Sequence, residues 1–446
     1  MSLFGSLFSG VSGLNAQSRA MGMISDNIAN VNTTAYKGAL AQFENMVTRS
    51  RGSSAYSPGG VRAQSFYTVA TQGLIQSSAS PTDVAISGAG FFVVNAPPDG
   101  QGEQVYTRAG SFSPDYQGDL RTTSGYYLQG WALDANEQVV DVNTLENVNT
   151  RSINGLAAAT TRVEIGANLD ADATPYAGAY AAGDLAAWAA SGGTAGVQPT
   201  FSRDVQVYDS LGRGHDLTLS FLRTGAANSW AVEVGAEAGD VDAGVHVNGL
   251  LASGTLTFNG DGSLAAASLV PVVSGIANGP VDVQWAPAAG AAPSSLAFDF
   301  GEPGGVDGVS QFASPTNVAF VNQNGAEVGE LSAVSIDAEG YITASFTNGE
   351  ERRLYRLPIA TFANPAALDP RSGNVFAQTD GSGEFNLREA GMGGAGVVAP
   401  SALEAANVDL AEEFTKMIVT QRAYSANAKV INTTDQMLEE LIRMTS

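Results

Sequence analysis

The sequence predicts a mainly β protein with an α-helix at each chain end, and three observations lead to this prediction. Apolar residues recur at heptad spacing near both termini. Between these segments, short runs rich in Val, Ile, Phe and Tyr are separated by Asn-Gly and Asp-Gly turns, a pattern typical of β-hairpins. Strand and helix patterns do not alternate in the middle of the chain, which argues against a parallel doubly wound sheet.

The N-terminal helix is predicted over residues 3–28. Its apolar residues follow a four-three spacing with small serines between them, as in a coiled-coil seam. We expect this stripe to be an assembly surface. Its members are Leu7, Val11, Leu14, Met21 and Ile28.

The C-terminal helix is predicted over residues 401–444, with Ser401 and Glu404 as a capping box at its start. At 1.5 Å per residue it would be about 60 Å long, which is long for a globular domain. An apolar stripe at heptad spacing is usually the face by which a helix packs on the core of its own domain. Here the length of the helix and its position at the chain end favour assembly between copies of the protein. The stripe contains Leu410, Phe414, Met417, Gln421, Tyr424, Ile431 and Leu438, with Gln421 as a polar interruption.

Strands and turns fill the region between the helices. The clearest strands are GFFVVN (90–95), VQVYDS (205–210), LTLSFL (217–222) and VAFVNQ (318–323). The hairpin turns are predicted at Asp99-Gly100, Asp115 to Gly118, Asn259-Gly260, Asn324-Gly325 and Asn348-Gly349.

Two stretches of low complexity, 173–198 and 286–295, are predicted to be linkers because Ala, Gly, Ser and Pro dominate them. They suggest two nested β domains, with the outer one inserted into the inner one. The predicted parts are terminal helices at 1–35 and 400–446, a neck at 36–79 and 366–399, an inner β domain at 80–150 and 300–365, and an outer β domain at 151–299.

Charge and composition exclude several classes of partner and site. The net charge of −23 disfavours nucleic acid and anionic lipid as partners. The chain has no cysteine, which removes disulfides, thiol catalysis and thiolate metal sites. The apolar N-terminus has its first basic residue only at Arg19, so we expect no cleaved signal peptide, and no apolar run is long enough for a membrane helix.

Titratable groups suited to catalysis are scarce. Lysine occurs only at Lys37, Lys416 and Lys429, so the β region has no amine for a phosphate-binding loop or a Schiff base. Of the two histidines, His215 is expected on a surface turn. The GMGGAG run at 391–396 follows no clear strand and is expected to be a connector. We therefore expect no catalytic, cofactor-binding or metal-binding site.

The two chain ends carry motifs of a known family. Residues 12–38, with Asn27, Asn30, Asn32 and Tyr36 in the run NIANVNTTAYK, resemble the N-terminal motif of the bacterial flagellar axial family. That family comprises rod, hook and hook-associated proteins. Residues 403–442 resemble its C-terminal motif. Ala35 departs from the family pattern, in which many members carry glycine there.

The middle of the chain resembles the hook-type members of this family, through residues 207–221, 314–325 and 354–368. The resemblance implies a structural subunit that assembles with many copies of itself into a flexible extracellular tube, which transmits torque as a universal joint. It also implies export through the flagellar type III apparatus without cleavage. The implied partners are the distal rod protein, the hook cap protein and the hook–filament junction protein.

Four alternatives stay open from the sequence. A distal rod protein with an insertion, or a hook–filament junction protein, would share the terminal motifs. Outside the family, a secreted β-rich adhesin or a surface-acting hydrolase would fit the composition. An adhesin should carry a secretion signal or an anchor, and a hydrolase should carry a convergent acid–base set; the sequence shows neither.

Overall fold

The computed structural model describes residues 3–46, 59–96, 102–134, 136–151 and 155–445. The chain divides into two compact units: unit 1 contains residues 1–152, 333–345 and 351–446, and unit 2 contains residues 153–332 and 346–350. Most regular elements are strands, with long helices at the two chain ends, so the predicted fold class is confirmed. The predicted division into four parts stays a prediction. Unit 2 runs past residue 299 because β20 (Val309–Phe312) and β21 (Asn317–Gln323) pair with β12 (Arg162–Asp170).

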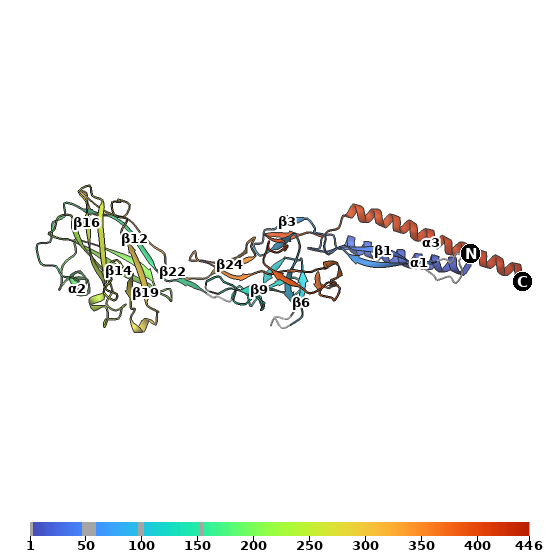
Figure 1. The fold of residues 1–446 in the computed structure, drawn as a ribbon, viewed down its shortest axis with the longest axis horizontal. Helices are drawn as coiled ribbons and strands as arrows, with labels where there is room; N and C mark the ends of the chain where they lie inside the picture. The colour runs from blue at the N-terminus through green and yellow to red at the C-terminus, as the bar shows by residue number, and fades with distance from the viewer. Residues whose placement is uncertain (1–2, 47–58, 97–101, 135, 152–154, 446) are drawn as a thin grey trace. The chain divides into compact units, whose positions relative to one another are not determined.

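Helices α1 (Leu3–Ala29) and α3 (Leu410–Thr445) pack antiparallel along each other in unit 1 (Figure 1). The predicted start of the second helix at Ser401 was wrong. Ser401 has a φ of 48°, and the next residues form strand β31 (Ala402–Glu404). Asp409 caps the helix, since its Oδ1 accepts hydrogen bonds from the amides of Ala411 at 2.8 Å and Glu412 at 3.2 Å.

Small residues on α1 allow the two helices to approach closely. Ala16 and Ala20 of α1 are buried, with exposed fractions of 2% and 3%. A Cβ atom placed on Gly13 would lie 2.8 Å from Nδ2 of Asn427, and one on Gly10 would lie 3.0 Å from Cγ1 of Ile431. We call the α1 residues Gly10, Gly13, Ala16 and Ala20 the small-residue seam.

A long hairpin of β1 (Ala39–Met46) and β2 (Gly60–Tyr67) also packs on α1 in unit 1. The amide of Val61 donates to Oγ of Ser12 at 3.2 Å, which attaches the hairpin to the helix. Figure 1 shows β1 running along α1. Strands β1 and β2, which belong to the region predicted as a neck, therefore lie along the helix.

The β region of unit 1 is built mainly from one sheet of thirteen described strands. Its central order is β23-β24-β25-β9-β5-β6-β28-β27. The strands of this central order are β23 (Leu331–Ile336), β24 (Tyr341–Phe346), β25 (Glu351–Arg356), β9 (Tyr127–Ala132), β5 (Phe91–Asn95), β6 (Gln104–Thr107), β28 (Val375–Ala377) and β27 (Asp369–Arg371). The strands beside this path are β7 (Phe112–Pro114), β8 (Leu120–Thr122), β10 (Glu146–Asn147), β26 (Ile359–Thr361) and β29 (Asn386–Arg388).

Two further strand pairs attach the C-terminal segment to unit 1. Strand β3 (Ile75–Ser77) pairs with β31, and β4 (Val84–Ser87) pairs with β30 (Val397–Pro400). The chain before α3 is therefore held in the β region by two antiparallel ladders. The GMGGAG connector forms the turn between β29 and β30.

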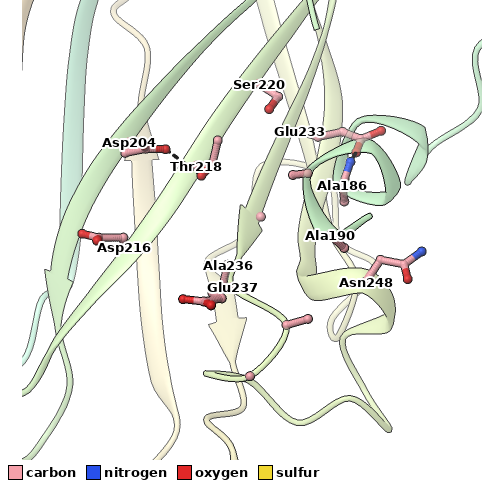
Figure 2. A pocket seen from close by; sticks show the side chains of 14 residues that line it. Ala186, Ala190, Asp204, Asp216, Thr218, Ser220, Glu233, Ala236, Glu237 and Asn248 are labelled. Atoms are coloured by element: carbon pink, nitrogen blue, oxygen red, sulfur yellow. Dashed lines mark hydrogen bonds between the residues drawn. The ribbon is translucent and has the colours of Figure 1, made fainter. Parts of the chain in front are cut away.

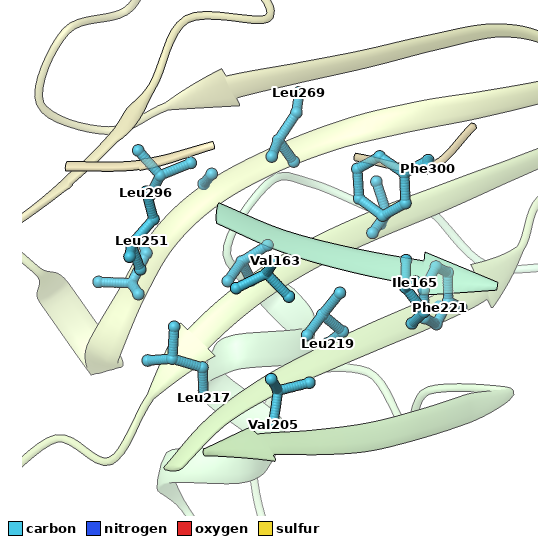
Figure 3. Close-up of a cluster of buried hydrophobic side chains, with 14 of the residues drawn as sticks. Val163, Ile165, Val205, Leu217, Leu219, Phe221, Leu251, Leu269, Leu296 and Phe300 are labelled. Carbon is cyan, nitrogen blue, oxygen red and sulfur yellow. The ribbon is translucent and has the colours of Figure 1, made fainter. Parts of the chain in front are cut away.

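Unit 2 consists of two five-stranded sheets that enclose one hydrophobic cluster. Figure 3 shows Val163 and Ile165 of β12 close to Leu217, Leu219 and Phe221 of β14. One sheet contains β13 (Phe201–Tyr208), β14 (Gly214–Arg223), β15 (Ser229–Ala236), β16 (Leu250–Phe258) and β17 (Leu264–Pro271). The other contains β12 (Arg162–Asp170), β18 (Val281–Val283), β19 (Ser294–Asp299), β20 (Val309–Phe312) and β21 (Asn317–Gln323). A separate pair, β11 (Leu156–Ala158) with β22 (Ala326–Gly329), completes the unit.

The linker prediction for residues 173–198 was wrong, because this stretch packs on the sheet through α2 (Asp184–Ala190). The buried carboxylate of Glu233 on β15 accepts hydrogen bonds from Tyr180 Oη at 2.7 Å and from the Ala186 amide at 2.8 Å. Residues 286–295 are also attached, since Trp285 Nε1 donates to Ser294 Oγ at 2.9 Å. Composition does not show these contacts, because Glu233 comes from a distant strand and Trp285 lies just before the second stretch.

Three of the predicted hairpins are confirmed, at Gly118, Asn259-Gly260 and Asn348-Gly349. The prediction at Asn324-Gly325 was wrong, because β21 pairs with β12 and β22 pairs with β11. The turn at Asp99-Gly100 lies outside the described residues.

Candidate assembly site

The two chain ends meet in a cluster of polar side chains, which we call the polar junction: Asn27, Lys37, Glu404, Asn407 and Glu413. Four of the five are buried, with exposed fractions of 1% for Asn27, 4% for Lys37, 0% for Glu404 and 4% for Glu413. Burying a polar group without a partner costs about 1–3 kcal/mol. The positions of these side chains are therefore constrained, because each buried polar group must form hydrogen bonds or ion pairs to avoid that cost.

Glu404 connects four segments of unit 1. Its Oε1 accepts hydrogen bonds from Lys37 Nζ at 2.5 Å and from the Gly73 amide at 2.7 Å. Its Oε2 lies 3.3 Å from Nη1 of Arg108, and its backbone oxygen accepts the Ala35 amide at 2.7 Å. Burial lowers the pKa of both Lys37 and Arg108, and the carboxylate of Glu404 opposes that shift. Two buried cations thus share one buried carboxylate.

Asn27 joins the end of α1 to β1 and to the first turn of α3. Its Oδ1 accepts the Ala39 amide at 2.9 Å, and its Nδ2 donates to Ala39 O at 2.9 Å and to Glu413 Oε2 at 3.2 Å. Tyr36 Oη donates to the same Oδ1 at 3.2 Å. Burial, with Asp26, Tyr67 and Glu413 nearby, raises the pKa of Tyr36 to about 12.

Asn407 makes the corresponding connection just before α3. Its Oδ1 accepts the Gly38 amide at 2.8 Å, and its Nδ2 donates to the backbone oxygens of Thr68 and Thr71 at 3.0 Å each. One carboxamide therefore binds the segment after α1 and the segment after β2. The C-terminal motif is thereby fixed to the N-terminal one.

The other two asparagines predicted as site residues lie apart from the junction. Asn30 Nδ2 donates to Asp26 O at 2.9 Å and so ends α1 locally. Asn32 is exposed. The structure thus brings Asn27 and Tyr36 together and leaves Asn30 and Asn32 outside.

Alanine at position 35, where many family members carry glycine, strains the backbone. Ala35 is 1% exposed and adopts a φ of 56°, where an L-residue loses about 1–2 kcal/mol relative to glycine. We expect Ala35→Gly to keep the stability of unit 1 within about 1 kcal/mol, since the relieved strain offsets the lost methyl contact and the added chain entropy. Ala35→Val should cost at least about 2 kcal/mol, because a β-branched residue is excluded there.

Hydrogen exchange of the unit 1 amides measures both changes. The control is Ala41→Val, at a half-buried strand position of β1 where valine is well suited. If Ala35→Val were as stable as Ala41→Val, the positive φ would not restrict the residue at this position.

Most residues of the apolar stripes predicted on the helices are half-buried or exposed in the single chain, although Ile431 faces Gly10 across the α1–α3 contact. On α1, Val11 is exposed and Leu7, Leu14, Met21 and Ile28 are half-buried. On α3, Leu410 is 40%, Phe414 51% and Tyr424 44% exposed. Gln421 is exposed, while Met417, Ile431 and Leu438 are half-buried. Much of the predicted apolar surface is therefore open in the single chain.

Sequence reasoning missed two groups of residues at this site. The first is the small-residue seam, where glycines were passed over because they add nothing to an apolar stripe. The second is Glu404, which was interpreted as a helix cap, together with Glu413. A signal was present, because Lys37 is one of only three lysines and lies in an apolar setting that calls for a buried carboxylate.

His215 was predicted on a surface turn, and this was wrong. It is 8% exposed on β14, its ring stacks on Trp285 at 4.0 Å, and its nitrogens lie 3.3 Å from Asp209 Oδ2 and 3.1 Å from Asp240 Oδ2. Burial alone would raise the pKa of Asp209, but hydrogen bonds from the Arg213 amide and from His215 hold it below its usual range. These contacts tie the β13–β14 hairpin to the turn after β15.

The ionisable residues that line one pocket of unit 2 are all carboxylates. The pocket has a volume of about 470 Å³, and its ionisable lining residues are Asp204, Asp216, Glu233 and Glu237. Figure 2 shows Glu233 directed at the N-terminus of α2 and Asp204 bonded to Thr218. Across the described residues, no group of three or more His, Asp or Glu side chains could hold a metal ion.

Comparison with family models covers much of the chain. Residues 7–37 match the model described as flagella basal body rod protein, and residues 399–444 match the flagellar basal body rod FlgEFG protein C-terminal model. Residues 85–168 match the flagellar hook protein FlgE/F/G D1 domain, and residues 194–326 match the flagellar basal body protein FlaE D2 domain. The ranges matched by the first two models include Asn27, Tyr36, Asn407 and Glu413.

Full-length relatives agree with these matches. The chain is 35% identical over 448 residues to the flagellar hook protein FlgE of Rhizobium meliloti, covering 100% of both chains. It is 32% identical to the Caulobacter vibrioides protein of the same name, again over 100% of both. The Salmonella typhimurium protein is 32% identical over 97% of this chain and 98% of its own length.

Proposed function

The chain belongs to the flagellar hook protein family, and from that premise we propose that its terminal helices make the contacts between neighbouring copies. It is a structural subunit of the hook, a part of the flagellum outside the cell. Polymerisation into the hook and association with the basal body are implied by the same family. The observation that carries the proposal is the exposed apolar surface of α1 and α3.

Large apolar side chains that face water on a long helix favour a further contact. Besides Phe414, α3 exposes Ile418 at 52%, Val419 at 61% and Met437 at 54%. On α1, Phe4 is 73% and Phe8 is 54% exposed. Apolar patches exposed on a protein surface mark interaction sites, and the burial of each large apolar side chain contributes about 1.5–3 kcal/mol to binding. Neighbouring copies with the same helices are the partners that this surface fits best.

The polar junction and the terminal helices have different roles in this proposal. Its hydrogen bonds fix where each terminal helix leaves the β region, so that the helices can pair without a large loss of chain entropy at each contact. The predicted parts 1–35 and 400–446 then form the axial core, and the β parts lie outside it. The boundaries at 36–79, 366–399, 80–150, 300–365 and 151–299 belong to this proposal.

The specific partners follow from family membership and are also proposals. We expect one end of the tube to bind the distal rod protein and the other to bind the cap protein and then the hook–filament junction protein. Export through the flagellar type III apparatus without cleavage accords with the family. Among the described residues, no helix has the length and apolar character that crossing a membrane requires. The family is structural, and we propose no catalytic role.

Replacing Phe414 with glutamate tests the assembly proposal. The variant chain should fold as the parent does, because Phe414 is 51% exposed. The critical concentration for polymerisation should rise at least about 30-fold, because the lost burial of one Phe costs about 2–3 kcal/mol per contact. Light scattering and electron microscopy of purified chains measure both the concentration and the tubes.

Gln436→Glu on the same helix is the matched control, since Gln436 is exposed and lies outside the predicted assembly residues. It adds the same charge and should polymerise as the parent does. Equal critical concentrations for the Phe414 variant and the parent would contradict the assignment of this face.

A further inference from the structure

Three segments carry the chain to and from unit 2. One leads into β11, one leaves β22, and the third is the tip of the β24–β25 hairpin, residues 346–350, which belongs to unit 2 while both of its strands lie mostly in unit 1. Strands β11 and β22 pair antiparallel, with Leu156 opposite Gly329 and Ala158 opposite Ala326. The ladder is irregular between Leu156 and Ala158, so its backbone groups need other partners.

The side chain of Asn348 joins these three segments. Its Nδ2 donates to Leu156 O at 2.8 Å and to Glu327 O at 2.7 Å, while its Oδ1 accepts the Glu350 amide at 3.1 Å. A primary carboxamide is the side chain that supplies two donors and an acceptor in one plane. Aspartate at this position would present acceptors to two carbonyl oxygens.

Two further features hold the hairpin tip in place. The Thr347 amide donates to Glu330 O at 2.9 Å, and the Glu330 amide donates to Thr347 Oγ1 at 3.0 Å. A Cβ atom on Gly329 would lie 2.4 Å from Cγ of Asn348, so the carboxamide occupies space that only glycine leaves open. Both the hairpin tip, through Asn348, and the segment that faces it, through Gly329, therefore contribute to this contact.

We propose that Asn348 is a positioning residue that ties the three connecting segments into one support and so limits the motion of unit 2 about its connections. Without the carboxamide, the β11–β22 and β23–β24 ladders and the contact through Thr347 and Glu330 would remain, but the hairpin tip would lose its direct hydrogen bonds to β11 and β22. The consequence for a bending tube rests on the proposed function: the support sets how far the outer β part of each subunit can move. The tie itself is a property of the single chain.

Spin labels test the tie directly. The chain has no cysteine, so Ser113→Cys in unit 1 and Ser202→Cys in unit 2, both exposed, give one label in each unit. Asn348→Ala and Asn348→Asp should each broaden the distance distribution measured by pulsed electron paramagnetic resonance by about twofold, because lost hydrogen bonds release local motion. Distributions as narrow as the parent's in both variants would overturn the proposal.

The matched control is Asn259→Ala, at another Asn-Gly hairpin turn of unit 2. There the carboxamide donates only to Ser263 Oγ within the turn, at 2.9 Å, so the distribution should not change. Circular dichroism confirms folding of every variant. If Asn348→Ala does not fold, Gly329→Ala replaces it, because the added methyl displaces the same carboxamide. Polymerisation of the unlabelled Asn348 variants is scored separately: it tests the proposed function, whereas the distance distribution tests the tie.

Discussion

Replacing Glu404 with glutamine is expected to destabilise unit 1 by about 3–5 kcal/mol, the usual cost of breaking a buried ion pair from one side. The carboxylate is 0% exposed and is shared by Lys37 and Arg108, which are themselves almost fully buried. The amide of glutamine leaves two buried cations without a counter-charge. It also puts a donor where Oε1 or Oε2 now accepts. Hydrogen exchange of the buried amides of β4 and β5 in unit 1 measures the change in free energy of unfolding.

Glu412→Gln is the matched control for this change. Glu412 pairs with Lys416 at 3.0 Å, but its side chain is 66% exposed, so the loss should stay below about 1 kcal/mol. Adding Lys37→Met to Glu404→Gln should recover part of the stability, since one unpaired cation is removed. If Glu404→Gln cost no more than Glu412→Gln, the polar junction would not hold the chain ends together.

Replacing Gly13 with leucine is expected to separate α3 from α1. A Cβ atom alone would lie 2.8 Å from the carboxamide of Asn427, and a leucine side chain adds three more carbon atoms at this close approach. Overpacking of this kind typically costs about 1–3 kcal/mol. Because isolated helices are marginally stable, both helices should lose helicity and protease resistance. Circular dichroism and limited proteolysis of the purified chain measure these losses.

Gly22→Leu is a control on the same helix with the opposite expected sign. An added Cβ at Gly22 meets nothing within 4 Å, so the exchange removes the helix cost of glycine, about 0.8–1 kcal/mol, at no steric expense. The two substitutions thus use the same residue types and should change helicity in opposite directions. A gain of helicity in both variants would show that α1 and α3 do not pack through Gly13.

Local patterns predicted the elements well where the pattern belongs to one segment. The heptad spacing of α1 and the strands around Phe92, Leu219 and Val321 follow from periodicity along the chain. The start of α3 was misplaced because Ser401 and Glu404 satisfy a local capping rule. Glu404 lies in strand β31 instead, where it gains an ion pair with Lys37 that a helix start could not supply.

The histidine and the linker were mispredicted for a related reason. His215 sits in a polar run, DSLGRGHDL, that resembles a surface turn, yet Asp209 and Asp240 enclose it and Trp285 covers its ring. The Ala-rich stretch around Leu185 has no periodic pattern, and it is ordered by Glu233 from β15. Asp209 belongs to the same run as His215, but Asp240, Trp285 and Glu233 lie outside the local segments that they order.

Patterns along the chain are enough to predict the β fold with terminal helices and, through the motifs around Asn27 and Asn407, the family. Those features are local, since a heptad, a turn dipeptide or a motif is complete within one segment. The three-dimensional packing is needed to show that Glu404 pairs with Lys37 and Arg108, that α1 meets α3 through Gly10 and Gly13, and that Asn348 reaches two strands. Such contacts depend on how segments pack in space. A glycine matters there because a neighbouring segment occupies the space that a side chain would otherwise take.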